Sequence, residues 1–273
     1  MIIVVSDLHL GYEKSAEKEF KEFMEKHVAE TLSSDDHFVL LGDIFDFWRK
    51  RNLDCMYKSD DILDAILHLE ANVHYVIGNH DCVLYRIRKR YKDYNTFEIH
   101  KRLRLVYQGT TFYLTHGYEL DVYANYEPLT IWEYEKLSEE LCRTGNALGR
   151  VLGDLWGIRK KMKKPPQKRK HWKKDSQAGL LPTRASDLSR LELFACSAGK
   201  NIFLGMDRKE YLIFGHTHRP FITTTTANTG SWVKTKPQEY DCYTYVIIDN
   251  RGISLCQWEA GKEIIRSTIL PMQ

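Results

Sequence analysis

Five short apolar runs recur along the chain, and each is followed by a glycine or a polar residue. They cover residues 2–5, 38–41, 74–77, 112–115 and 211–214. Runs of this length that stop at Gly or Asp are typical of buried strands, although a short buried helix segment has the same pattern. Because the pattern occurs five times, we interpret the runs as strands.

Charged and apolar residues alternate at helical spacing in several other segments. The spacing predicts amphipathic helices over residues 13–32 and 60–70, so strand and helix alternate up to about residue 90. Further helices are expected at 129–152 and 185–204.

Hairpin signals dominate two further segments, residues 97–115 and 227–270. Gln108-Gly109 and residues 249–252 are turn sequences within them. A βαβ half is therefore expected to join a more antiparallel half. The fold class is α/β, a two-sheet β-sandwich flanked by helices.

Side chains with metal-binding donors follow every apolar run. In layered α/β sheets, ligands gather outside the carboxyl ends of the strands, so five loops can converge on one site. Asp, Asn and His offer oxygen and nitrogen donors that suit Mn²⁺, Fe²⁺/Fe³⁺ or Zn²⁺. Seven such side chains exceed what one ion needs, which implies two ions with one bridging carboxylate. The candidate ligands are Asp7, His9, Asp43, Asn79, His116, His216 and His218.

Each of these motifs has an ordinary explanation when it is taken alone. Asp-x-His and Gly-Asp are common by chance, and residues 78–81 have the composition of a turn. The metal-site interpretation rests on the combination, because all the motifs occur in order behind a predicted strand.

In this combination the chain resembles the calcineurin-like metallophosphoesterase superfamily, whose pattern D-x-H, G-D-x-x-D, G-N-H-D, H-G and G-H-x-H is complete here. The resemblance covers roughly residues 1–117 and 211–232 and implies the metallophosphoesterase fold. It implies that one metal is held by Asp7, His9, Asp43 and His218. It implies that the other is held by Asp43, Asn79, His116 and His216, with Asp43 as the bridge.

The same resemblance implies roles for three more residues. His80 would not bind metal but would lie beside the scissile phosphate, where an imidazolium can stabilise charge or protonate the leaving oxygen. Asp81 would orient His80 through the other ring nitrogen. Asp46 would fix the direction of a metal ligand, or else cap the following helix.

Residues 42–48, 215–220 and 228–232 are similar to the UDP-2,3-diacylglucosamine hydrolase branch, which cleaves a pyrophosphate in a nucleotide-linked lipid precursor. Arg219 and Asn228 are the residues of these segments that we expect beside the ligands or the substrate. The branch usually has arginine at the position of His80. This departure bears on the substrate and not on the chemistry.

The insert between the last two ligand loops suggests a lid. We expect a catalytic domain of residues 1–117 and 211–273, with a helical lid insertion at 118–210. Residues 159–174 within it hold ten Lys or Arg and no acid; without them the chain has 30 basic against 37 acidic residues, a net charge of −7 instead of +3. Such a block either is a solvated loop or attracts polyanions, namely an anionic membrane, a nucleic acid or a pyrophosphate.

Length and composition agree with an intracellular enzyme of this kind. A chain of 273 residues with 43% hydrophobic content can bury a substantial core. We expect neither a signal peptide nor a membrane span, and the six scattered cysteines indicate reduced thiols. The expected location is the cytoplasm, with peripheral contact at the inner face of the membrane if residues 159–174 bind lipid. No obligate protein partner is expected.

The first functional hypothesis is a phosphoesterase with two divalent ions, Mn²⁺ preferred and Fe or Zn as alternatives. A metal-bridging hydroxide would attack a phosphate ester or pyrophosphate bond, preferably in a nucleotide- or lipid-linked pyrophosphate. The alternatives are a metal-dependent nuclease of the same superfamily and a non-catalytic scaffold.

Overall fold

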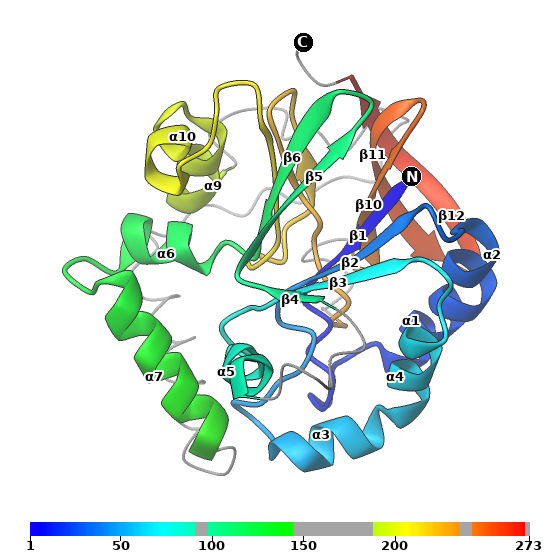
Figure 1. Cartoon of the computed structure of the whole chain (residues 1–273), viewed down its shortest axis with the longest axis horizontal. Helices are drawn as coiled ribbons and strands as arrows, with labels where there is room; N and C mark the ends of the chain where they lie inside the picture. The colour runs from blue at the N-terminus through cyan, green and yellow to red at the C-terminus, as the bar shows by residue number, and fades with distance from the viewer. Residues whose placement is uncertain (91–97, 145–187, 235–241, 271–273) are drawn as a thin grey trace.

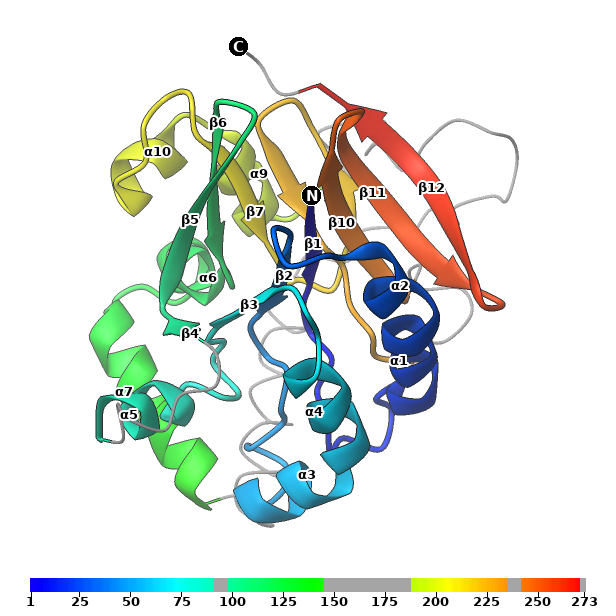
Figure 2. The ribbon, with the colours of Figure 1, turned by 45° about the vertical axis from the view of Figure 1, so that its right-hand side comes forward.

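Two β-sheets face each other in the computed structural model, and helices cover their outer surfaces (Figures 1 and 2). The structure describes residues 1–90, 98–144, 188–234 and 242–270. The predicted two-sheet α/β sandwich is thereby confirmed.

The seven-stranded sheet has the order β12-β11-β10-β1-β2-β3-β4. Strands β1 to β4 run parallel, and β10 to β12 continue the sheet in antiparallel fashion beside β1. Its strands are β1 (Ile2–Val5), β2 (His37–Leu41), β3 (Asn72–Val76), β4 (Glu98–His100), β10 (Thr244–Asp249), β11 (Gly252–Glu259) and β12 (Lys262–Ile269).

The five-stranded sheet has the order β5-β6-β7-β9-β8. Here β6, β7 and β9 are parallel, so their carboxyl ends lie at one edge. Its strands are β5 (Arg102–Tyr107), β6 (Thr110–Thr115), β7 (Tyr211–Phe214), β8 (Phe221–Ile222) and β9 (Thr226–Asn228).

Side-chain alternation along β1 explains why it is apolar at every position. Ile2 and Val4 belong to the core between the two sheets, whereas Ile3 and Val5 face the core under the helices. A central parallel strand covered on both faces needs apolar residues on both.

The helices differ from the prediction mainly in their bounds. The helix expected at 13–32 is a continuous run of α1 (Glu17–Phe23), the π-helical η1 (Met24–Val28) and α2 (Ala29–Thr31). The one expected at 60–70 is α4 (Asp60–Leu67). Three described helices lie outside the predicted helical ranges, α3 (Asn52–Lys58), α5 (Val83–Arg90) and α6 (Tyr118–Asn125). Helix α3 buries only Cys55 and so lacks an apolar periodicity.

The described part of the insert is helical. It contains α6 (Tyr118–Asn125), α7 (Ile131–Thr144), α9 (Arg190–Cys196) and α10 (Gly199–Leu204). The helix predicted at 185–204 is interrupted between α9 and α10, and its residues 185–187 lie outside the described ranges. Residues 145–152 of the predicted helix 129–152 lie outside them as well.

Strand β4 corrects the expectation of a hairpin over all of residues 97–115. It pairs in parallel with β3, and only β5 and β6 form the hairpin, which turns at Gln108-Gly109 as predicted. Within the described ranges, no helix has the length and apolar character that crossing a bilayer requires.

Candidate metal centre

The predicted metal ligands meet where the carboxyl ends of parallel strands from both sheets converge. Asp7 and His9 follow β1, Asp43 follows β2 and His116 follows β6. Six predicted site residues line a pocket of about 180 Å³, while Asp7 and His116 lie fully buried beneath it. The six are His9, Asp43, Asn79, His80, His216 and His218.

Several ligand loops hold a left-handed backbone that side chains rarely adopt. The φ angles are 53° at Asp7, 50° at His9, 52° at Asp43, 65° at His216 and 57° at His218. A residue with a Cβ atom pays roughly 1–2 kcal/mol for this conformation. Strain of this kind concentrates at functional sites, where the surrounding fold maintains it.

Asp7, His9 and His218 form the first group of donors. His218 Nε2 lies 3.1 Å from Asp7 Oδ1 and 3.2 Å from His9 Nε2. His9 Nε2 is also 3.8 Å from Asp43 Oδ2. The donor atoms of this group therefore face a common point.

Asp43, His116 and His216 form the second group. His116 Nε2 lies 3.2 Å from Asp43 Oδ2 and 3.3 Å from His216 Nδ1. Asn79 adds a buried Oδ1 that finds no hydrogen-bond partner among the described residues. Asp43 Oδ2 is thus near the donors of both groups.

The two carboxylates each use one oxygen for the protein and keep the other for the centre. Asp7 Oδ2 accepts a hydrogen bond of 2.8 Å from the His216 backbone N–H. Asp43 Oδ1 accepts one of 2.8 Å from the His80 backbone N–H. Each bond ties one ligand loop to another and aims the remaining oxygen at the imidazoles.

This donor set fits two divalent cations. The Asp7 and Asp43 groups each bring a carboxylate and two imidazoles within 4.8 Å of one another. Carboxylate oxygen and imidazole nitrogen suit ions such as Mn²⁺, Fe²⁺ and Zn²⁺. The unsatisfied Asn79 Oδ1 is a further oxygen donor for the second group.

The pKa shifts of the candidate ligands also indicate a site for cations. Burial would raise the pKa of Asp7 and Asp43, but nearby imidazoles outweigh it and hold both pKa values well below their ordinary range. Burial would lower the pKa of His116, yet Asp43 and Asp7 raise it to about 10. The carboxylates thus create a strongly negative site that stabilises positive charge, whether carried by a proton or by a metal ion.

Buried partners fix the direction of the ligand rings. His116 Nδ1 lies 3.0 Å from the Leu41 carbonyl oxygen, and His9 Nδ1 lies 3.3 Å from Asp46 Oδ2. Metal-binding imidazoles usually have such a partner on the second nitrogen. This is the position expected for Asp46.

Asp121 is a further partner that the sequence did not reveal. Its Oδ2 lies 2.8 Å from His216 Nε2. Asp121 belongs to α6, in the first turns after Gly117, and no motif marks it. Only the docking of α6 against the β7 loop brings the two residues together.

His80 lies in the pocket wall next to both groups of ligands. Its Nδ1 is 3.0 Å from Asp46 Oδ1, and its Nε2 is 3.9 Å from Asp43 Oδ2. Trp48 stacks on the imidazole at a centroid distance of 4.0 Å. His80 could also complete a ligand group with His9 and Asp43 by distance alone.

The expectation that Asp81 orients His80 is wrong, because Asp46 has that contact. Asp81 instead accepts hydrogen bonds from the Gly78 N–H at 2.6 Å, the Ile44 N–H at 2.8 Å and the Tyr75 hydroxyl at 2.6 Å. Burial and the charge of Asp43 raise the pKa of Asp81 to about 6. Asp81 therefore links the loop that follows β2 to the loop that follows β3.

Arg219 and Asn228 support the last ligand loop. Asn228 is fully buried and donates to the Gly215 carbonyl oxygen at 2.7 Å and to Thr217 Oγ1 at 3.2 Å. Arg219 Nη1 donates to Glu192 Oε2 of α9 at 2.8 Å. Asn228 is thus placed to shape the loop that carries His216 and His218.

Comparison with known proteins gives a family and a similar fold. The sequence matches the family described as calcineurin-like phosphoesterase over residues 1–220. Its structure is similar to a dimetal phosphatase from Danio rerio, with 12% identity, 98% of each chain covered and a TM-score of 0.51. At this identity the likeness concerns the fold.

Two other solved structures show weaker similarity. A predicted phosphoesterase from Streptococcus pneumoniae has 16% identity over 97% of each chain, with a TM-score of 0.36. A protein of unknown function from Aquifex aeolicus has 21% identity over 52% of this chain and 71% of that chain, with a TM-score of 0.31. None of the curated proteins compared with this chain matches it.

The family match spans well over half of the chain and includes every loop that carries a candidate ligand. The chain therefore belongs to the calcineurin-like phosphoesterase family.

Proposed function

We propose that this protein hydrolyses a phosphate ester or pyrophosphate bond, with a nucleotide- or lipid-linked pyrophosphate as the preferred substrate. Two divalent ions, Mn²⁺ in preference to Fe or Zn, would supply Lewis-acid polarisation of the phosphoryl oxygens and a nucleophile near neutral pH. One ion would be held by Asp7, His9, Asp43 and His218. The other would be held by Asp43, Asn79, His116 and His216.

His80 is the residue best placed to handle a proton at the leaving oxygen. Its Nδ1 lies 3.0 Å from Asp46 Oδ1, and a hydrogen bond to this carboxylate orients the ring and leaves Nε2 free of that contact. The ring belongs to the pocket wall, and stacking on Trp48 limits its rotation. His80 can therefore donate a proton from Nε2 to a substrate oxygen in the pocket.

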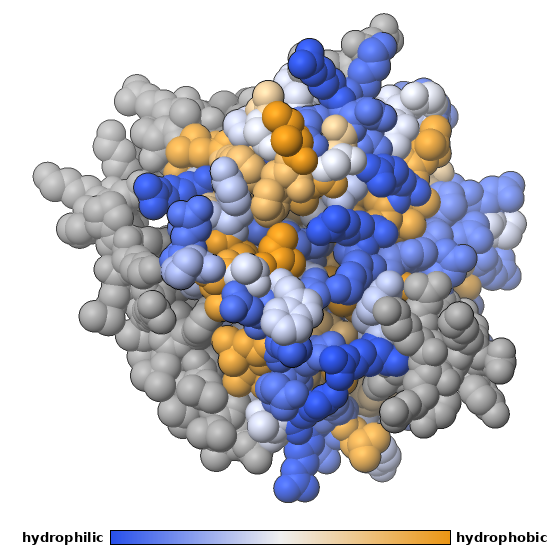
Figure 3. Space-filling view, turned by 60° about the vertical axis from the view of Figure 1, so that its left-hand side comes forward, coloured by the Kyte–Doolittle hydropathy of each residue, from blue (hydrophilic) through white to orange (hydrophobic). Residues whose placement is uncertain are grey.

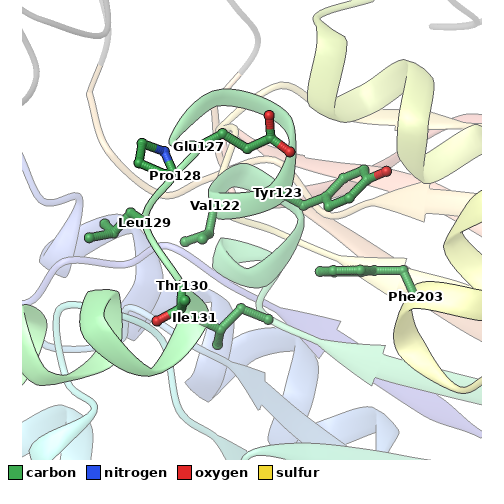
Figure 4. Close-up of a pocket in the computed structure, with 8 residues that line it drawn as sticks. All are labelled: Val122, Tyr123, Glu127, Pro128, Leu129, Thr130, Ile131 and Phe203. Atoms are coloured by element: carbon green, nitrogen blue, oxygen red, sulfur yellow. The ribbon is translucent and has the colours of Figure 1, made fainter.

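An apolar pocket of about 400 Å³, lined by residues of the insert, supports a substrate with an apolar part (Figure 4). Phe203 of α10 and Tyr123 of α6 contact each other on one side of it, with ring centroids 4.8 Å apart. The remaining lining residues come from the end of α6, the connection that follows and the start of α7: Val122, Glu127, Pro128, Leu129, Thr130 and Ile131.

One chain segment lines both pockets, and this observation carries the proposal. Asp121, Tyr126 and Tyr134 line the metal-centre pocket. Val122 and Leu129, on the same segment, line the apolar pocket. A molecule with its phosphate at the metals can therefore place an adjoining apolar group along α6. Lipid-linked substrates have this division into a charged head and an apolar chain.

The described helices of the insert support the proposed lid of residues 118–210. Asp121 of α6 contacts His216, and Cys142 Sγ of α7 donates to the His80 carbonyl oxygen at 3.1 Å. The insert thus touches the site from two sides. A movement of α6 or α7 would therefore alter the surroundings of His216 and His80.

The outer face of these helices mixes hydrophobic residues with charged ones (Figure 3). Ile202 of α10 is 89% exposed, and Tyr123 of α6 is 49% exposed. This face is compatible with peripheral contact at a membrane that supplies a lipid-linked substrate. The basic stretch 159–174, on which the nuclease alternative and the contact with anionic lipid depend, lies outside the described residues.

The test is hydrolysis with Mn²⁺ across bis(p-nitrophenyl) phosphate, p-nitrophenyl phosphate, a UDP-sugar, a CDP-lipid and single-stranded DNA. We expect the CDP-lipid to be cleaved fastest and His80→Ala to lower kcat by about 10²–10⁴-fold. Cleavage of DNA alone would favour the nuclease. A protein that binds the metals and cleaves none of these would favour the scaffold.

Leu129→Glu examines the apolar pocket separately. A carboxylate there should raise KM for the CDP-lipid by about tenfold, since a tenfold change corresponds to about 1.4 kcal/mol of binding. The UDP-sugar has no acyl chain and should be cleaved as before. Leu137→Glu on α7 is the matched control, because Leu137 is 38% exposed and is not among the residues lining the pocket. Equal effects on both substrates would contradict the assignment of this pocket.

A further inference from the structure

A second cluster of imidazole and carboxylate groups lies on strands β3 and β4, apart from the pocket residues described above. It consists of His74, Glu98 and His100. His74 and Glu98 are direct neighbours across the parallel pair, and His100 follows Glu98 by two positions. Residues two apart on a strand point to the same face. All three side chains therefore share one face of the seven-stranded sheet at its β4 edge.

The donor atoms of the three residues are close together. Glu98 Oε2 lies 3.1 Å from His100 Nε2 and 3.7 Å from His74 Nδ1. One donor atom from each residue lies within 4.8 Å of the other two. Two imidazoles and a carboxylate at such separations can be bridged by one ion with small movements of the side chains.

His74 has an unused nitrogen aimed into this cluster. The residue is only 9% exposed, and its Nδ1 has no hydrogen-bond partner in the part of the chain that the structure describes. Its other nitrogen, Nε2, lies 3.0 Å from His37 Nδ1 on β2. A metal-binding imidazole usually donates its second N–H to a hydrogen-bond acceptor, which fixes the ring. His37 Nδ1 can be that acceptor here.

The protonation of His74 agrees with a ligand role. Burial and the neighbouring imidazole of His37 lower the pKa of His74 to about 4. The ring is therefore neutral near pH 7, and a neutral imidazole is the form that binds metal. Glu98, whose side chain is 67% exposed, leaves the cluster accessible from solvent.

We propose that His74 Nδ1, Glu98 Oε2 and His100 Nε2 bind one transition-metal ion of the Zn²⁺ class, with His37 orienting the ring of His74. Two imidazoles and one carboxylate form a set that Zn²⁺ accepts, with water in the fourth position. The site is separate from the two-ion centre and does not depend on the proposed substrate.

The ion would join the edge strand β4 to the strand that leads into the catalytic loop. Strand β4 pairs with β3 over only three residues. The His100 carbonyl oxygen accepts a hydrogen bond of 2.9 Å from the Ile77 N–H, directly before Gly78 and Asn79. A metal ion bound between β3 and β4 would therefore fix the start of the loop that carries Asn79 and His80.

The test is the zinc content of the full chain after equilibrium dialysis at one buffered free zinc concentration. Glu98→Gln and His100→Gln should each hold about one zinc ion fewer per chain than the wild type. They should also lose part of the zinc-induced rise in Tm. Glu98→Gln keeps the test interpretable if His100→Gln folds poorly, because Glu98 is largely exposed.

His68→Gln is the matched control. His68 is an exposed histidine 3.2 Å from Asp64, so it reports zinc bound by surface imidazoles. Its zinc content should equal that of the wild type. Equal zinc in the wild type, Glu98→Gln and His100→Gln would overturn the proposal. A wild type that hydrolyses none of the phosphate esters would overturn the proposed function instead and leave the zinc difference unchanged.

Discussion

The carboxylate of Asp46 lies 3.0 Å from Nδ1 of His80 through one oxygen, while its second oxygen lies 3.3 Å from Nδ1 of His9. One fully buried aspartate therefore orients both a candidate metal ligand and the candidate proton donor. Burial opposes ionisation of Asp46, but His80 and His9 hold its pKa well below the ordinary range. Ligand geometry and proton donation are thus coupled through a single side chain.

Asp46→Asn should lower kcat/KM by about 10–100-fold, the usual effect of removing a partner of a metal-binding imidazole. An amide is almost isosteric but carries no charge to stabilise an imidazolium at His80. The measurement is the rate of bis(p-nitrophenyl) phosphate hydrolysis at saturating Mn²⁺. Asp61→Asn is the control, because Asp61 is an exposed residue paired with Lys21. Equal activity of both variants would show that Asp46 has no such role.

Asp121→Asn tests the partner of His216. Without the carboxylate 2.8 Å from Nε2, the His216 ring should be held less firmly, and the apparent Mn²⁺ affinity should fall by about 10–100-fold. Activity measured against Mn²⁺ concentration should shift to higher metal, with kcat largely recovered at excess Mn²⁺. A loss of kcat with no shift in the metal dependence would argue for a role of Asp121 at the substrate.

The candidate ligands could be predicted from the sequence because each follows a short strand that is mostly apolar. The strands at 2–5 and 211–214 were predicted to the residue, since both of their faces are buried. Contacts that depend on how a helix packs against a sheet could not be predicted from the sequence in this way. Asp121 reaches His216 only because α6 packs beside β7, a relationship with no periodicity.

Asp81 shows a second limit. Its place next to His80 in the sequence suggested contact, but its oxygens face the backbone N–H groups of Gly78 and Ile44. Two adjacent side chains in a turn point in different directions, so the sequence order of His80 and Asp81 does not show which of them enters the pocket. Helix α3 was missed for another reason, since it buries too little apolar surface to show a pattern.

Cys142 should be inert in the native protein although it lies next to the site. Its Sγ donates to the His80 carbonyl oxygen at 3.1 Å and lies 3.9 Å from Cys82 Sγ. Burial raises the pKa of Cys142 well above the ordinary range, so little thiolate forms. Iodoacetamide should label Cys142 about tenfold or more slowly than the partly exposed Cys242, followed by mass spectrometry. In urea the two rates should converge, and rapid labelling of Cys142 without denaturant would contradict its burial.

The turn between β10 and β11 should make a pH-dependent contribution to stability. Asp249 Oδ1 accepts from the Arg251 N–H at 2.8 Å, and Oδ2 accepts from Arg251 Nε at 2.8 Å. Partial burial would raise the pKa of Asp249 in the folded state, but these hydrogen bonds lower it. The stabilisation is therefore present above the unfolded pKa of about 3.9 and is lost as the pH falls through the lower folded value.

Because Arg251 is 57% exposed, Asp249→Asn should cost only about 0.5–1 kcal/mol at pH 7. Urea unfolding from pH 7 to pH 3 should show the two proteins converging below about pH 4. Arg251→Ala should reduce the difference without removing it, because the backbone N–H of residue 251 still donates to Asp249. A difference that persists at pH 3 would mean that the amide disturbs the turn itself.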